Sequence, residues 1–172
     1  LVAGLVSGLL GVIYAVGQHD LKRLLAYRSM ENVGIILMGL GVGMIGVAAD
    51  QPVMAVLGFA GGLLHLLNHA IFKSLLFRGS VMVLHHTGTR TMDLLGGLGK
   101  RMPITGATFL VGAVAISGLP PFNGFTGEFF IYMGGFSGVA LAKTGFVLSV
   151  LAVVGLAMIG GLALVCFTKA LG

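Results

Sequence analysis

The chain has 172 residues, of which 57% are hydrophobic and only 9% are charged. Its mean hydropathy of +1.08 excludes an ordinary soluble domain, in which about a quarter of the residues are charged. The net charge of +5 does not indicate nucleic-acid binding, because the basic residues fall in short connections between apolar stretches. The sequence therefore predicts an integral membrane protein that contacts the lipid bilayer and no nucleic acid.

Five stretches of the chain are apolar and long enough to cross a bilayer as helices, which takes about 20 residues each. The expected spans are residues 1–18, 24–48, 53–86, 104–139 and 144–168. They predict an all-α fold, a polytopic transmembrane helix bundle that occupies residues 1–172 as a single domain. Because the apolar pattern is already under way at the first residue, we expect this domain to be a fragment of a longer subunit.

The third and fourth stretches are each longer than one simple span, for different reasons. Residues 53–86 read as one continuous helix, so we expect it to tilt or to protrude from the bilayer. In the fourth stretch, Pro120 and Pro121 lie in the middle, between glycines at 118 and 124. Proline has no backbone N–H to donate. We therefore predict that this helix is broken at the Pro/Gly motif.

Lysine and arginine are concentrated in alternate connections between the expected spans. One side of the bundle receives Lys22, Arg23, Arg90, Lys100, Arg101 and Lys169, whereas the other receives only Lys143. Cytoplasmic loops carry the excess of Lys and Arg in membrane proteins. The distribution predicts a multi-pass protein of the cell inner (plasma) membrane whose basic loops are cytoplasmic, with Lys143 and Lys169 as interfacial anchors.

Three titratable residues of the third stretch, His65, His69 and Lys73, are spaced four apart and so share one helix face. A charge at this depth is costly unless it faces protein or water, so ionisable residues there indicate an ion or proton route. Histidine and lysine can both take up and release protons. In the alternative interpretation, these side chains merely make hydrogen bonds across the bundle.

The two histidines also have the spacing of zinc ligands, but Leu66 stands where the HExxH motif requires glutamate, and no third ligand is evident. We therefore expect no metal site. The single cysteine, Cys166, excludes an internal disulfide and a cysteine-held cluster. No motif for a flavin, quinone or iron–sulfur centre is present, so we expect no bound cofactor.

Two glutamates inside the apolar stretches are further candidates. Glu128 follows the Pro/Gly break closely, and charges near broken helices mark ion routes in transporters; the alternative is a local cap or salt bridge. Glu31 lies three residues after Arg28 and would take part in a proton relay or form a charge pair with it. Because Glu31 also lies near Lys22 and Arg23, a position close to the interface is a further possibility. For Arg78 the sequence suggests no role.

Three segments resemble a known family. They are residues 20–34 (DLKRLLAYRSMENVG), residues 68–77 (NHAIFKSLLF) and residues 117–125 (SGLPPFNGF). Together they resemble the antiporter-like membrane subunits of respiratory complex I, Mrp cation/proton antiporters and membrane-bound hydrogenases. Within that family the chain is most similar to the large membrane subunit of formate hydrogenlyase and hydrogenase 4.

The resemblance implies a fold of two inverted five-helix repeats, of which this chain corresponds to the second. It further implies that Lys73 is the central proton-relay lysine, that His65 and His69 are its companions, and that Glu128 connects the relay to one membrane face. Two positions depart from the family pattern, since Arg28 stands where histidine or serine is expected and Arg78 where a small or apolar residue is expected. The implied partners are other membrane and peripheral subunits of a respiratory or hydrogenase complex.

The leading hypothesis is therefore a proton-translocating membrane subunit of a redox-driven complex, of the NADH:quinone oxidoreductase or hydrogenase type, with oxidoreductase activity in its partners. One alternative is an Mrp-type Na⁺/H⁺ antiporter subunit, which would depend on sodium. The other is a structural membrane subunit without ion transport, in which the buried charges form static pairs.

Overall fold

The structure is a computed structural model that describes residues 1–141 and 144–171, so that Lys143, a predicted interfacial anchor, lies outside the described residues. These residues form an all-helical bundle, and among them the only β-type pairing is a single bridge between Asp20 and Thr91. The elements are α1 (Val2–Val16), α2 (Leu21–Ala48), α3 (Pro52–Thr87), η1 (Met92–Leu94), α4 (Leu98–Arg101), α5 (Pro103–Ile116), α6 (Asn123–Ser137), η2 (Gly138–Ala140) and α7 (Thr144–Leu171).

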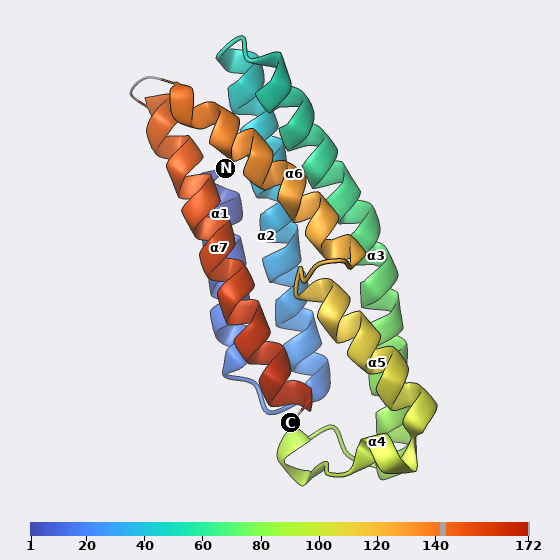
Figure 1. Cartoon of the computed structure of the whole chain (residues 1–172). Helices are drawn as coiled ribbons and strands as arrows, with labels where there is room; N and C mark the ends of the chain where they lie inside the picture. Colours follow the sequence, from blue (N-terminus) through green and yellow to red (C-terminus); the bar gives the residue numbers. More distant parts are fainter. Residues whose placement is uncertain (142–143, 172) are drawn as a thin grey trace.

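The two long helices α2 and α3 lie side by side through the length of the bundle (Figure 1). On one side α1 packs along α2 and is covered by α7; on the other, α5 and α6 follow one another along α3. The polar connection that contains η1 and α4 closes one end of the bundle. Helix α2 is therefore the most interior of the long helices, with contacts to α1, α3, α6 and α7, whereas α3 is buried mainly on the face that packs against α2, α5 and α6.

Helices are observed within each of the five predicted stretches. Three helices, α2, α3 and α7, are long and apolar enough to cross a membrane, while α1 and α5 are shorter apolar helices. The 36 residues of α3 correspond to about 54 Å of helix, longer than a bilayer is thick, as predicted. The second helix begins at Leu21 rather than at residue 24, because Asp20 caps it by accepting hydrogen bonds from the backbone N–H groups of Lys22 and Arg23.

The break in the fourth stretch is confirmed. Helix α5 ends at Ile116, α6 begins at Asn123, and Gly118 between them has a left-handed φ of 66°. The first turn of α6 is attached to α3 through Asn68, whose side chain donates to the backbone oxygen of Asn123 at 2.7 Å. The Asn123 side chain donates in return to Asn68 Oδ1 at 3.3 Å. The start of α6 is therefore fixed to α3 at Asn68.

Glycines allow the central helices to approach closely. A Cβ added at Gly34 of α2 would lie 2.4 Å from the backbone nitrogen of Gly8 in α1. A Cβ at Gly58 of α3 would likewise lie 2.3 Å from the nitrogen of Gly43 in α2. Contacts this short exclude any larger residue without movement of a helix. The α1–α2 and α2–α3 contacts are therefore tight at these glycines.

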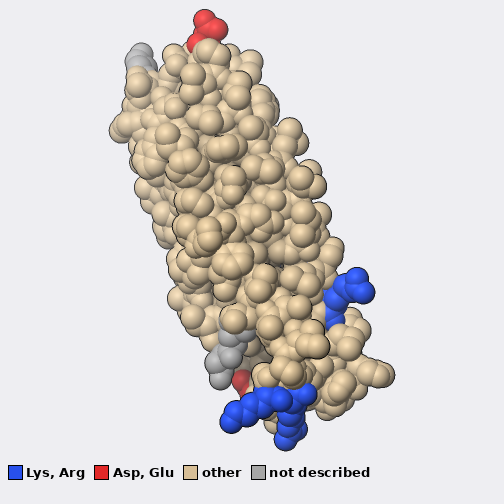
Figure 2. Space-filling model, turned by 45° about the vertical axis from the view of Figure 1, so that its right-hand side comes forward, with Lys and Arg blue, Asp and Glu red and all other residues tan. Residues whose placement is uncertain are grey.

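Basic side chains are gathered at one end of the molecule, below a body that shows almost no charge (Figure 2). This end holds the start of α2, the end of α3 and the connection that follows, which carries Arg90. Arg90 Nε lies 3.5 Å from Asp20 Oδ2, and His19 Nδ1 lies 2.8 Å from Asp93 Oδ2. The two connections that make up the basic end are thus held together by polar contacts.

Candidate functional site

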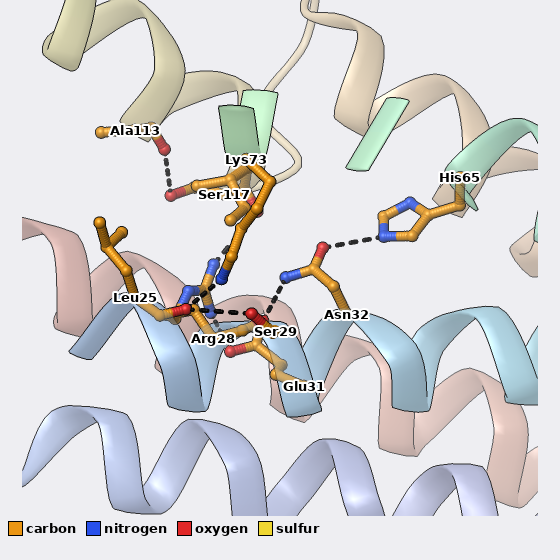
Figure 3. A network of polar contacts seen from close by, with 10 residues as sticks. Leu25, Arg28, Ser29, Glu31, Asn32, His65, Lys73, Ala113 and Ser117 are labelled. Atoms are coloured by element: carbon orange, nitrogen blue, oxygen red, sulfur yellow. Dashed lines mark hydrogen bonds and ion pairs between the residues drawn. The ribbon is translucent and has the colours of Figure 1, made fainter. Parts of the chain in front are cut away.

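Polar and charged side chains are gathered inside the bundle beside the helix break (Figure 3). They come from the first half of α2, from the facing part of α3 and from the end of α5. Arg28, Glu31, Asn32 and His65 are each no more than 1% exposed. Such a group of side chains is expensive within an apolar bundle unless its members satisfy one another or serve a function.

Arg28 has the most extensive contacts of the group. Its Nη1 donates to Glu31 Oε2 in a buried ion pair, and its Nη2 donates to the backbone oxygen of Ile116 at 3.1 Å. The guanidinium carbon lies 4.9 Å from the ring centroid of Phe167 in α7, a cation–π distance. One residue of α2 therefore joins the last turn of α5 and the far end of α7.

Asn32 links α2 to the first histidine of α3. Its Nδ2 donates to the backbone oxygen of Arg28 at 2.8 Å, so its Oδ1 is directed across to His65 Nε2 at 3.0 Å. An amide oxygen only accepts, so this contact places the proton on Nε2 when His65 is neutral. The other ring nitrogen, Nδ1, is buried without a partner among the described residues.

Lys73 lies two turns further along α3, on the same face. Its ammonium group donates to the backbone oxygen of Leu25, one turn before Arg28 in α2, and lies 4.9 Å from the ring centroid of Phe77. Lys73 is half-buried rather than enclosed. No ion pair between described residues joins it to Glu31 or Glu128. Its ammonium group is thus held by a carbonyl and an aromatic face rather than by a carboxylate.

A groove of about 540 Å³ runs between α2 and α3 and reaches both His69 and Lys73. The residues that line it are Val33, Ile36, Leu66, His69, Ala70, Lys73, Ser74 and Phe77. His69 Nε2 has no hydrogen-bond partner among the described residues although it is buried. The groove is open at the surface of the bundle, and five of the eight residues that line it are apolar.

Glu128 lies in the second turn of α6, after the break. Its carboxylate faces the turn at Gly118, where an added Cβ would lie 2.5 Å from Glu128 Oε2. The preceding residue, Gly127, is pressed against α3, since a Cβ there would lie 2.8 Å from His65 Cβ. Helix α6 therefore crosses α3 at His65, and this crossing holds Glu128 at the break. The side chain is 7% exposed.

The structure brings together most of the residues that the sequence suggested. The charge pair of Arg28 and Glu31 is present, with both side chains buried. His85 and Arg78 are exposed on the outer part of α3. Sequence reasoning missed the polar links, Asn32, Asn68 and Asn123, although an asparagine within an apolar helix signals a hydrogen bond across the bundle.

Comparison with known proteins agrees with this fold. The family model described as "NADH:quinone oxidoreductase/Mrp antiporter, TM" matches residues 1–155. Formate hydrogenlyase subunit 3 of Escherichia coli (strain K12) is 47% identical over 176 aligned residues, which cover all of this chain and 28% of that protein. Hydrogenase-4 component B of the same organism is 47% identical over 174 residues, which cover 98% of this chain and 25% of that protein. The chain therefore spans about a quarter of the length of these relatives.

Solved structures share the same arrangement of helices. A chain in the structure of the Mrp complex from Dietzia sp. DQ12-45-1b aligns over 98% of this chain and 28% of its own length, with a TM-score of 0.73 and 25% identity. A chain of the membrane-bound sulfane sulfur reductase, described as an archaeal respiratory membrane complex, aligns over 98% of this chain and 30% of its own, with a TM-score of 0.71 and 27% identity. This chain thus belongs to the family of antiporter-like membrane subunits of NADH:quinone oxidoreductases and Mrp antiporters.

Proposed function

We propose that this chain forms part of a transmembrane proton path in a redox-driven membrane complex. The observation that carries the proposal is the row of titratable groups inside an apolar bundle: Lys73, His69 and His65 along α3, and Glu128 across the break. Because buried ionisable groups are expensive in a membrane, their alignment beside a broken helix favours proton transfer over a purely structural role.

In this proposal a proton enters through the groove between α2 and α3, where water would connect bulk solvent to Lys73 and His69. Lys73 takes up and releases the proton, and the unpartnered ring nitrogen of His69 is available to accept it. His65, held by Asn32, lies where α3 crosses α6 at Gly127, the residue before Glu128. Glu128 passes the proton on through the break. Glu31 contributes as the counterion of Arg28 beside this route.

The wider setting is also part of the proposal. Relatives named as subunits or components of formate hydrogenlyase and hydrogenase-4 support partner subunits that carry the redox chemistry, so we expect this chain to hold no redox cofactor. The chain would form one repeat of a longer subunit. The basic end shown in Figure 2 would face the cytoplasm, in the plasma (inner) membrane.

The test is proton uptake into vesicles that contain the full-length subunit in its complex, driven by the redox reaction of that complex. Lys73→Ala should abolish uptake, whereas Lys100→Ala, an exposed lysine in the end connection, should leave it unchanged. Assembly is compared by the yield of purified complex. Normal uptake by Lys73→Ala in intact complexes would refute the relay.

Two alternatives predict different outcomes of the same experiment. The structural likeness to a chain of an Mrp complex favours Na⁺/H⁺ antiport as the second candidate, in which case proton movement would require sodium. A structural subunit, whose charges form static pairs such as that of Arg28 and Glu31, would instead show poor assembly of Lys73→Ala with no specific loss of uptake.

A further inference from the structure

The end of α5 is built from the kinds of oxygen atom that bind a sodium ion in membrane transporters. In those proteins the backbone carbonyls at the ends of half-helices coordinate the ion, together with other oxygen donors. Here the carbonyl of Ile116, in the last residue of α5, and the carboxylate of Glu31 converge on one buried point. The negative end of the helix dipole of α5 adds to the attraction for a cation.

The cation at that point is the guanidinium of Arg28. Its Nη1 donates a hydrogen bond to the Glu31 carboxylate, and its Nη2 donates one to the Ile116 carbonyl. Its third nitrogen, Nε, has no partner among the described residues. The ring of Phe167 lies over its face at 4.9 Å. Arg28 is 0% exposed, so no water or ion from outside competes for these oxygens. A permanent positive charge on a covalent tether thus lies between these two oxygens.

We propose that Arg28 determines the ion specificity of this path: its guanidinium occupies the position where an alkali cation would otherwise bind, and so restricts the path to protons. This inference rests on the proposed function, because it assumes that the buried titratable groups form a proton path. Glu31 is neutralised by Arg28, which leaves Glu128 as the one other carboxylate within the spans, because the three aspartates of the chain lie in connections. A proton needs only a titratable atom at each step, whereas a sodium ion needs several oxygens at once.

The test replaces the tethered cation in the full-length subunit within its complex. Arg28→Ser shortens the side chain, supplies a further oxygen and leaves Glu31 and the Ile116 carbonyl without their cation. The thermal unfolding midpoint is measured in NaCl and in KCl of equal ionic strength. For Arg28→Ser we expect a midpoint about 2 °C or more higher in NaCl, because an ion that binds only the folded state stabilises it. The wild type should show no difference.

Three matched variants make the result specific. Arg28→Lys keeps a tethered cation and should be as indifferent to sodium as the wild type. Arg28→Ser combined with Glu31→Gln removes the carboxylate as well as the guanidinium, so it should lose the sodium response. Arg78→Ser removes an exposed arginine of α3 and should behave as the wild type does. Assembly of Arg28→Ser only when sodium is present would support the proposal in the same way.

A sodium response in the wild type, or an equal midpoint for Arg28→Ser in the two salts, would overturn the proposal. So would failure of Arg28→Ser to assemble at every sodium concentration, because sodium would then not replace the guanidinium. The unfolding measurement does not require proton movement. A sodium response of Arg28→Ser would therefore stand even if Lys73→Ala pumped normally and the proton path itself were refuted.

Discussion

The interior of the bundle and its basic end use the same kinds of side chain under opposite conditions. At the basic end, Arg90 and Lys100 are exposed and can move into water. In the interior, Arg28 is fully buried and each of its contacts is supplied by the protein. Exposed charges contribute little to stability, whereas a buried charge must be paired or destabilise the fold. Burial, rather than residue type, therefore decides which charges of this chain contribute strongly to its stability.

The largest expected effect is in the interior pair. Glu31→Gln leaves the guanidinium of Arg28 without its counterion, which should cost about 3–5 kcal/mol of unfolding free energy. The measurement is chemical unfolding of the purified full-length subunit in detergent, followed by circular dichroism. Adding Arg28→Met to Glu31→Gln removes both charges and should recover most of the loss. A cost below about 1 kcal/mol for the single variant would mean that this pair behaves as an exposed one does.

The next effect tests the crossing of α3 and α6. Gly127→Ala would place a Cβ 2.8 Å from His65 Cβ, and the resulting overpacking should cost about 1–3 kcal/mol. The matched control is Gly160→Ala in α7, where an added Cβ meets nothing within 4 Å. There alanine should be neutral or stabilising by up to about 1 kcal/mol, because it favours the helix over glycine. The same unfolding assay compares the two, and equal effects would contradict a tight crossing at His65.

The smallest effect lies at the basic end. Asp20→Ala removes the cap of α2, whose side chain accepts from two backbone N–H groups at 2.8 and 3.0 Å, and should cost about 1 kcal/mol. Asp93→Ala, at a neighbouring exposed site where the side chain is paired with His19, should cost less than half as much. If the two variants unfold alike, the cap contributes no more than an exposed contact does.

Much of the fold could be predicted from the sequence, because apolar length and proline placement are local properties. The apolar stretches and the break between α5 and α6 needed only the length of apolar runs and the missing N–H of Pro120 and Pro121. The start of α2 at Leu21 was missed, although aspartate just before a helix is a recognisable cap. The burial of the charged residues could not be predicted in the same way, because burial depends on how neighbouring helices pack.

The candidate site was predictable in its residues but not in its connections. The four-residue spacing placed His65, His69 and Lys73 on one face, yet the structure divides them between an enclosed contact with Asn32 and an open groove. Spacing along a single helix does not reveal which neighbour it meets. In the same way, no pattern in α2 indicated that Arg28 would reach the carbonyl of Ile116, 88 residues further along the chain.

The two halves of the broken span are attached to different helices. The end of α5 is held by Arg28 of α2, and the start of α6 is held by Asn68 of α3. Any sliding of α2 against α3 would therefore pull the two half-helices in different directions and change the gap in which Glu128 lies. The positions of the two half-helices thus depend on how α2 lies against α3. A shift of one long helix along the other would therefore alter the surroundings of the Glu128 carboxylate without a change of charge.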